Sequence, residues 1–257
     1  MTLDGFRPDD RQAFVAFSPE LALKLRSVLG WVSRRLSTEV VGIERIPQGR
    51  AVIVANHAFG WDIAFPMAAI GEKLHRNVWA LGEHAWWKVP FLRRLAAATG
   101  TVDGTPENID KLLERDELVV VLPGGLREAV KPRELRYRLL WGHRYGFVRA
   151  AIRNRAPIVP LAALGADDWF DFVGDAYRRG ERWLGRRNIP IPLPSRLLPI
   201  PHLVRLRYVV GEPILPNVDP ALADDDDTVR RLRHEVEGAL HELIESELAR
   251  RAGIDAG

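Results

Sequence analysis

A histidine and an aspartate, His57 and Asp62, are the residues of this chain whose types and spacing point to acid–base chemistry. They follow the apolar run AVIVA at 51–55, and reactive groups gather at the carboxyl ends of strands in α/β sheets. A carboxylate beside an imidazole fixes its tautomer and stabilises its protonated form, so the pair could accept a proton from a hydroxyl group. The spacing also fits a structural alternative, in which Asp62 begins a helix and His57 fills a loop.

A second set of candidates lies in the stretch LPGGLRE at 122–128, where an apolar run ends in a glycine turn. Glycines let backbone amides approach a ligand closely, which makes Gly124 and Gly125 candidates for substrate contact. Arg127 could bind a phosphate or a developing negative charge. The alternative is an ordinary glycine turn with a surface arginine.

Other kinds of chemistry find little support in the sequence. The chain has no cysteine, which excludes disulfides, thiolate catalysis and cysteine-bound metals. It lacks the nucleophile-elbow, P-loop and dinucleotide-binding patterns, and HELIE at 241–245 lacks the second histidine of a zinc pattern. We therefore expect no metal site and no cofactor. Lysine and arginine number 37 against 34 acidic residues, a balance that argues against nucleic-acid binding.

Short apolar runs alternate with helical patterns from residue 38 onward. The alternation predicts an α/β fold with a mixed, mostly parallel sheet covered by helices on both faces. The expected strands are 38–46, 51–56, 77–82, 118–125, 157–165 and 203–213. The expected helices between them are 63–74, 85–98, 106–117 and 143–155.

The whole chain, 1–257, is expected to form a single domain. Residues 1–37 would be a tail and an amphipathic basic helix that begins at Pro19. Residues 38–217 would form the α/β core, with an insertion at 166–202 rich in arginine, tryptophan and proline. Residues 218–257 would form a long C-terminal helix. Its predicted buried stripe is Val229, Leu232, Val236, Leu240 and Leu243.

Taken together, these stretches resemble the sequence blocks of the glycerolipid acyltransferase superfamily, which includes the lysophosphatidic acid acyltransferases. NHAFGWD at 56–62 matches the first block, Asn-His-x4-Asp, and LPGGLRE keeps the proline, second glycine and arginine of the third block. APIVPLAALG at 156–165 matches the fourth, and the resemblance covers about residues 38–215. It implies that His57 and Asp62 are catalytic. It also implies substrate contacts at Asn56, Gly124, Gly125, Arg127 and Glu128.

Two departures bear on the substrate. Gly124 stands where members that use phosphate-bearing acceptors have glutamate, and Gly104 stands where many of them have arginine. The form PGG-x-RE looks more like the monoacylglycerol and diacylglycerol acyltransferase-like branch, whose members often acylate a neutral lipid alcohol. Some members of that branch replace the aspartate of the first block, which this chain keeps as Asp62.

The resemblance implies acyl transfer from acyl-CoA or acyl carrier protein to the hydroxyl group of a glycerolipid or other lipid alcohol. One alternative is a 1-acyl-glycerol-3-phosphate acyltransferase specifically. Two others use the same fold without transfer to a lipid: a non-catalytic lipid-binding protein and a thioester hydrolase.

The sequence further predicts a peripheral protein on the cytoplasmic side of the cell membrane. No window holds 18 uninterrupted apolar residues, and the first residues lack the pattern of a signal peptide. Residues 178–187 carry five arginines against one glutamate, with Trp183 among them, and 131–155 carry eight basic residues against one acid. Such stretches suit an anionic membrane surface, although a solvated basic face is the alternative.

Overall fold

The computed structural model describes most of the chain. The described residues are 19–35, 37–59, 62–83, 96, 100–185, 190–194, 202 and 204–253. Apart from residue 96, the helix expected at 85–98 lies outside them, as does the tail before residue 19.

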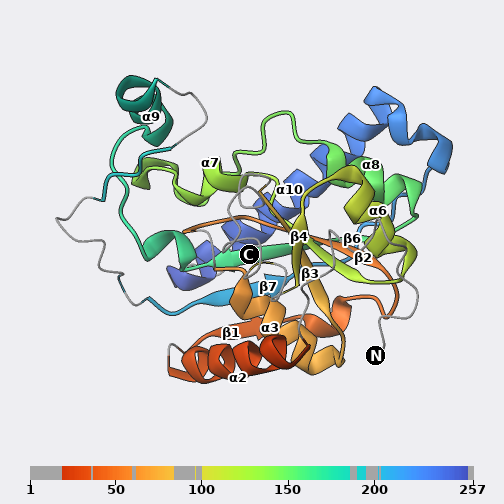
Figure 1. Ribbon diagram of the computed structural model, residues 1–257, viewed down its shortest axis with the longest axis horizontal. Coiled ribbons are helices and arrows are strands. Elements are labelled where there is room, and N and C mark those ends of the chain that lie inside the picture. Colours follow the sequence, from red (N-terminus) through yellow and green to blue (C-terminus); the bar gives the residue numbers. More distant parts are fainter. Residues whose placement is uncertain are drawn as a thin grey trace.

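The described strands form one sheet in the order β1-β7-β6-β2-β5-β3-β4 (Figure 1). They are β1 (Glu39–Val41), β2 (Ala51–Ala55), β3 (Val78–Gly82), β4 (Thr101–Asp103), β5 (Leu118–Val121), β6 (Ile158–Leu164) and β7 (Arg207–Val210). Strands β6 and β7 are antiparallel, and all other neighbours are parallel. The expected mixed, mostly parallel sheet is therefore confirmed.

Strand β2 occupies the centre of the sheet, between β5 and β6. Every residue from Ala51 to Ala55 is fully buried, which explains why the sequence there is apolar without alternation. Val52 and Val54 pack into the core on one face, and Ile53 packs into the core on the other. The loop after β2 is thus held by the most buried strand of the domain.

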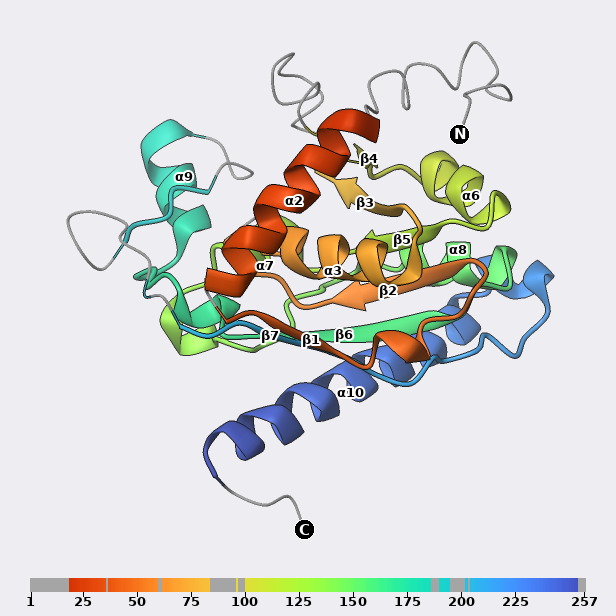
Figure 2. The ribbon, with the colours of Figure 1, turned by 90° about the horizontal axis from the view of Figure 1, so that it is seen from below.

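Helices cover both faces of the sheet. The described α-helices are α2 (Pro19–Arg35), α3 (Ala64–Leu74), α6 (Pro106–Glu114), α7 (Gly125–Ala129), α8 (Gly146–Arg153), α9 (Ala176–Leu184) and α10 (Asp226–Arg251). Figure 2 shows α2 and α3 over one face and α10 over the opposite face. One core contains side chains of α6, α8 and α10, and the other contains side chains of α3.

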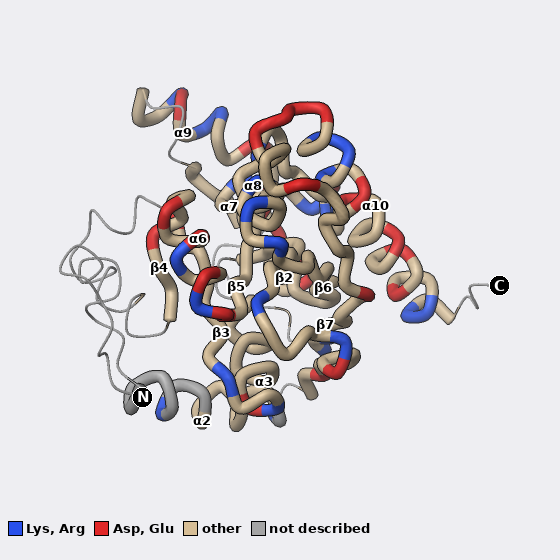
Figure 3. The backbone as a smooth tube through the Cα atoms, turned by 90° about the vertical axis from the view of Figure 1, so that its right-hand side faces the viewer, with Lys and Arg blue, Asp and Glu red and all other residues tan. Residues whose placement is uncertain are grey.

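The C-terminal helix α10 is shorter than the expected 218–257, because a 3₁₀ turn, η5 (Pro220–Asp224), precedes it and it ends at Arg251. The Asp225 side chain accepts a hydrogen bond from the Thr228 amide, the first turn is acidic and the last turn is basic. Figure 3 shows charged residues of both signs along its length. The predicted buried stripe is confirmed except at its last position, where Ile244 is buried and Leu243 is only half-buried.

Several segments differ from the expectation: β4 and α7 were not expected, and β5 ends at Val121 rather than at residue 125. The first strand ends at Val41 because Gly42 adopts a left-handed conformation with φ of 79°, and a 3₁₀ turn, η2 (Ile43–Arg45), follows. Between β6 and β7 the chain forms another 3₁₀ turn, η4 (Ala166–Asp168), and then α9. The segment expected as an insertion therefore contains ordered helical structure.

Helix α2 packs on α3 and leaves part of its apolar surface uncovered. Leu29 and Val32 are half-buried against the core on that side of the sheet. Val28 and Trp31 remain 56% and 55% exposed. Helix α2 therefore both packs on the core and exposes apolar side chains. None of the helices in the described ranges is long and apolar enough to cross a membrane.

Candidate active site

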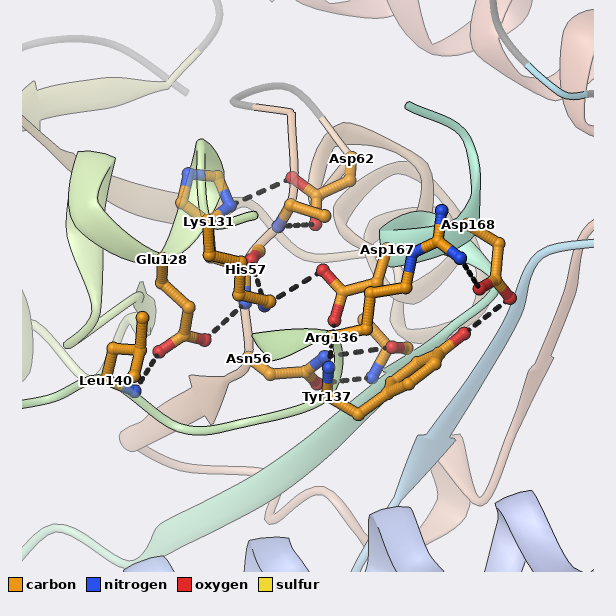
Figure 4. Close-up of polar contacts among 12 residues, drawn as sticks. Asn56, His57, Asp62, Glu128, Lys131, Arg136, Tyr137, Leu140, Asp167 and Asp168 are labelled. Carbon is orange, nitrogen blue, oxygen red and sulfur yellow. Dashed lines mark hydrogen bonds and ion pairs between the residues drawn. The ribbon is translucent and has the colours of Figure 1, made fainter. Parts of the chain in front are cut away.

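His57 and Asp62 meet in the loop that follows β2 (Figure 4). The Nδ1 atom of His57 lies 2.9 Å from Oδ1 of Asp62, and both side chains are almost completely buried. The two atoms are at ion-pair distance but lack the angular geometry of a hydrogen bond. Such contacts in active sites often align only when substrate binds. The structure thus brings the two expected catalytic residues together.

The loop that carries His57 is fixed by side chains on both sides. The Asn56 amide group donates to the Ala163 carbonyl at 2.9 Å and accepts from the Ala163 amide at 2.7 Å, which attaches the loop to β6. Asp62 Oδ2 accepts from the Ala58 amide at 3.0 Å. The buried Tyr208 hydroxyl donates to the Asp62 carbonyl at 2.8 Å. Asn56 therefore acts on the protein's own backbone in this structure.

Glu128 is fully buried, and both of its carboxylate oxygens accept backbone hydrogen bonds. Oε1 accepts from the His57 amide and Oε2 from the Leu140 amide, each at 2.8 Å. Burial raises the pKa of Glu128, while the charge of Lys131 and the two backbone hydrogen bonds oppose that rise. The structure places Glu128 beside His57, with its oxygens directed at the protein rather than at solvent.

The glycine turn of the third block lies at the carboxyl end of β5. Gly124 is buried, and Gly125, with φ of 52°, donates its amide hydrogen to the Leu122 carbonyl at 2.9 Å. The Gly125 amide is thus already engaged. The Arg127 side chain is exposed, and Arg144 donates to the Pro123 carbonyl at 2.8 Å. Two arginines therefore flank the turn.

Sequence reasoning missed a buried ion pair beside the loop that carries His57. Lys131 Nζ lies 2.8 Å from Asp167 Oδ1, and both side chains are 3% exposed. Lys131 also donates to the His57 carbonyl at 3.1 Å, and Asp167 Oδ2 accepts from the Tyr137 amide at 2.6 Å. Burial raises the pKa of Asp167, and Lys131 opposes the rise. The one sequence signal was the position of Lys131, three residues after Glu128 and so about one helical turn away.

Half of the eight basic residues in the stretch 131–155 pair with acids from other segments. Besides buried Lys131, Arg136 pairs with Asp168 and Asp171, Arg149 with Asp224 and Asp226, and Arg153 with Asp110. The expectation that this whole stretch faces an anionic surface is therefore too broad, because several of its charges hold the fold together.

A small open pocket lies beside the loop that carries His57. Three aromatic rings contribute to its lining, where Phe59 meets Phe170 edge-on and Phe170 stacks on Phe172 with centroids 6.2 Å apart. The residues that line the pocket are Ala58, Phe59, Ala129, Lys131, Arg133, Arg136, Ala166, Asp167, Phe170 and Phe172. The loop is thus bordered by apolar rings as well as charges.

The chain is similar to known acyltransferases and to related proteins of unknown function. The acyltransferase family model matches residues 37–163. An uncharacterized protein of Mycobacterium tuberculosis is 33% identical over 223 residues, 82% of this chain and 61% of that protein. The "DGAT1/2-independent enzyme synthesizing storage lipids" of Homo sapiens is 31% identical over 209 residues, 80% of this chain and 60% of that protein. The chain thus spans about three fifths of the length of these curated relatives.

The crystal structure of the 1-acyl-sn-glycerophosphate (LPA) acyltransferase PlsC of Thermotoga maritima shares the fold. It matches with a TM-score of 0.55 at 16% identity, over 96% of this chain and 85% of that one. In this chain the fold brings the first and third sequence blocks together at the carboxyl ends of β2 and β5. The chain belongs to the glycerolipid acyltransferase superfamily.

Proposed function

We propose that this protein is an O-acyltransferase that moves a fatty acyl group from acyl-CoA or acyl carrier protein to the hydroxyl group of a glycerolipid or other lipid alcohol. The observation that supports the proposal most directly is the buried His57–Asp62 pair, with 2.9 Å between Nδ1 and Oδ1 at the carboxyl end of β2. Family membership supports the class of reaction.

In the proposed reaction His57 is the general base. Its Nε2 atom forms no hydrogen bond to any residue that the structure describes. Nε2 takes the hydroxyl proton as the lipid oxygen attacks the thioester carbonyl carbon, and the carbonyl electron pair moves to its oxygen. The tetrahedral intermediate then expels the thiolate, which takes the proton from the imidazolium. Atoms and charges balance without a covalent enzyme intermediate.

Asp62 stabilises the imidazolium that exists between the two proton transfers. Its carboxylate is fully buried, so its attraction for a charged ring is weakened less by water than at the surface. The Ala58 amide holds the carboxylate in place by donating a hydrogen bond to Oδ2 at 3.0 Å. Asp62 therefore acts on the charged state of His57 and only indirectly on substrate.

Arg127 is the proposed donor to the oxyanion or to a substrate phosphate. It is exposed at the glycine turn, whereas the Gly125 amide already donates to Leu122. The space beside Gly124 and Gly125 is filled by the side chains of Glu128 and Arg144, so these two positions shape the turn itself. Asn56 and Glu128 support the site through the hydrogen bonds described above.

A mass-spectrometric screen tests the proposed function. Purified protein is incubated with mixed acyl-CoAs or acyl carrier proteins and a panel of lysolipids and glycerides. New acyl esters, formed with equal release of free thiol, support the proposal. Thioester loss without acylated lipid identifies a hydrolase instead, and ligand binding without turnover identifies a non-catalytic lipid-binding protein.

We expect a neutral glyceride to outcompete lysophosphatidic acid as acceptor. Gly104 offers no cation to a phosphate, and charge-assisted hydrogen bonds are the strong ones. The test measures both products at equal acceptor concentration in mixed micelles. Preferential acylation of lysophosphatidic acid contradicts the prediction. In that case the same competition, measured with Arg144→Met, shows whether Arg144, which donates to the Pro123 carbonyl, supplies the positive charge that Gly104 lacks.

Membrane association is proposed from two exposed amphipathic surfaces. Helix α2 exposes Val28 and Trp31, and α9 exposes Trp183 at 76% and Leu184 at 53% on a helix that also carries Arg178. Aromatic and basic residues together suit the interface of an anionic membrane. The cytoplasmic side of the cell membrane is the proposed location.

Replacing Val28 and Trp31 together by serine should reduce co-sedimentation with vesicles that contain anionic lipid. Both side chains are exposed, so the change removes apolar surface without opening the core. Ser27→Ala, on the same helix, is the matched control. Unchanged sedimentation of a folded double variant removes α2 from the membrane surface. Point substitutions are preferable to deleting residues 1–37, because deletion would also uncover the half-buried contacts of Leu29 and Val32.

A further inference from the structure

The peptide backbone of His57 is held at both of its polar atoms by charged, buried side chains. Its amide donates to Glu128 Oε1 at 2.8 Å, and its carbonyl accepts from Lys131 Nζ at 3.1 Å. Both partners come from the segment that follows the glycine turn, at the end of a neighbouring strand. Glu128 is fully buried and Lys131 is 6% exposed. Buried charges are costly unless paired, so this arrangement calls for an explanation.

The two charged groups are themselves fixed from outside the catalytic loop. Glu128 accepts a second hydrogen bond from Leu140, and Lys131 pairs with Asp167, which follows β6. The network therefore joins the loops after β5, β2 and β6, three adjacent strands of the sheet. Figure 4 shows these contacts converging on His57 from both sides.

The glycine at 124 follows from this network. A Cβ atom on Gly124 would lie 2.0 Å from Oε2 of Glu128 and 2.4 Å from its Cβ, far inside van der Waals contact. Glu128 thus occupies the space that a side chain at position 124 would need. The glycine of this chain is required by its own Glu128, independently of the substrate.

We propose that Glu128 and Lys131 are positioning residues, which hold the His57 backbone so that the imidazole ring faces Asp62 and presents Nε2 to the substrate hydroxyl. The inference rests on the proposed function of His57 as general base. It assigns to Glu128 an action through His57 rather than contact with substrate. Asp167 supports Lys131 and so acts one step further from the ring.

The geometry explains why charged groups suit this task. Hydrogen bonds to ionised groups are about twice as strong as neutral ones, and each of these is shielded from water. A rigid backbone matters because a displacement of about 1 Å at a reacting group can cost about 10²-fold in rate. We call Glu128, Lys131 and Asp167 the clamp. His57 contributes only its main chain to the clamp, which leaves its ring free for chemistry.

The test compares Glu128→Gln, Lys131→Met and the double variant Lys131→Met/Asp167→Asn with the wild type. The double variant removes both charges of the Lys131–Asp167 pair together, so that neither member of this pair is left without its partner. Glu134→Gln is the matched control, because Glu134 is an exposed acid in the same segment. Gly124→Ala, which displaces Glu128 by contact, should behave like Glu128→Gln.

The first measurement needs no substrate. Nitrogen-15 spectra of histidine-labelled protein, assigned with His57→Ala, report the His57 amide and the tautomer of its ring. We expect a single tautomer with a proton on Nδ1 in the wild type and in Glu134→Gln, and mixed tautomers with a shifted amide signal in the clamp variants. Unchanged spectra in folded clamp variants overturn the proposal, whether or not acyl transfer is detected.

The second measurement uses the donor and acceptor found by the screen. Positioning predicts a loss of about 10²-fold in kcat with little change in KM. A raised KM with unchanged kcat would show that Glu128 contacts substrate. If every clamp variant fails to fold while His57→Ala folds normally, the network serves stability alone and the proposal is wrong. A screen without turnover would refute the proposed function. The spectra would still show whether Glu128 and Lys131 hold the His57 ring in position.

Discussion

Replacing His57 by alanine should lower the rate of acyl transfer by about 10²–10⁴-fold, the usual contribution of a general base. The variant lacks the imidazole that takes the hydroxyl proton in the proposed reaction. The fold should survive, because Glu128 and Lys131 bind the main chain of His57, which alanine keeps. The measurement is the initial rate with the donor and acceptor that the screen identifies.

Two controls make the His57→Ala result specific. His143, an exposed histidine before α8, can be replaced by alanine as a matched change that should leave the rate unaltered. Thermal unfolding shows whether each variant keeps its structure. A folded His57→Ala protein with more than half of the wild-type activity would show that another group is the base.

Asp62→Asn should lower kcat by about 10²–10⁴-fold, by analogy with the aspartate of a Ser-His-Asp triad. Asparagine cannot neutralise the imidazolium, and its amide hydrogens can favour the wrong tautomer of His57. Its side-chain oxygen can still accept from the Ala58 amide, so the loop should keep its shape. Because the charged ring exists only during reaction, KM should change little.

Separate measurement of kcat and KM for both substrates checks this role of Asp62. A variant whose only defect is weaker binding of the acceptor would place Asp62 at the substrate instead. Histidine spectra of Asp62→Asn supply an independent readout, since the tautomer of His57 should change even before substrate is added.

The sequence alone was sufficient for the parts of the molecule that depend on local patterns. The continuous apolar runs of β2, β5 and β6 reflect strands buried on both faces, and the acidic start of α10 reflects the helix dipole. His57 and Asp62 were found because they lie five residues apart at the end of a strand. Two residues this close in sequence can be recognised as a pair without knowledge of the rest of the fold.

The partners of His57 could not be found in the same way. Asp167 is far from Lys131 in sequence, and the pair forms only because β6 and β5 both neighbour β2. Lysine is usually exposed, so its type gives no hint of burial. The contacts of Glu128 were hidden for a similar reason: the backbone amides that it binds carry no sequence signature.

The number of basic residues along the chain overestimated the positive charge that reaches the surface. The basic residues of 131–155 form a dense cluster in sequence, yet acids from α6, η4 and the start of α10 neutralise several of them. A linear count cannot anticipate ion pairs that close through the fold. Surface charge therefore has to be judged after tertiary pairing.

The pairing of β1 with β7 has a consequence for how the chain is made. Glu39 lies opposite Arg207 in the sheet, so the first strand of the domain finds its neighbour only when nearly all of the core has been synthesised. Until then β1 has no partner and one edge of β6 is uncovered. Open edges invite pairing with other chains. A polypeptide that stops before residue 207 should therefore aggregate, whether it is still bound to the ribosome or has been released. Loss of the residues after α10, in contrast, leaves the sheet complete.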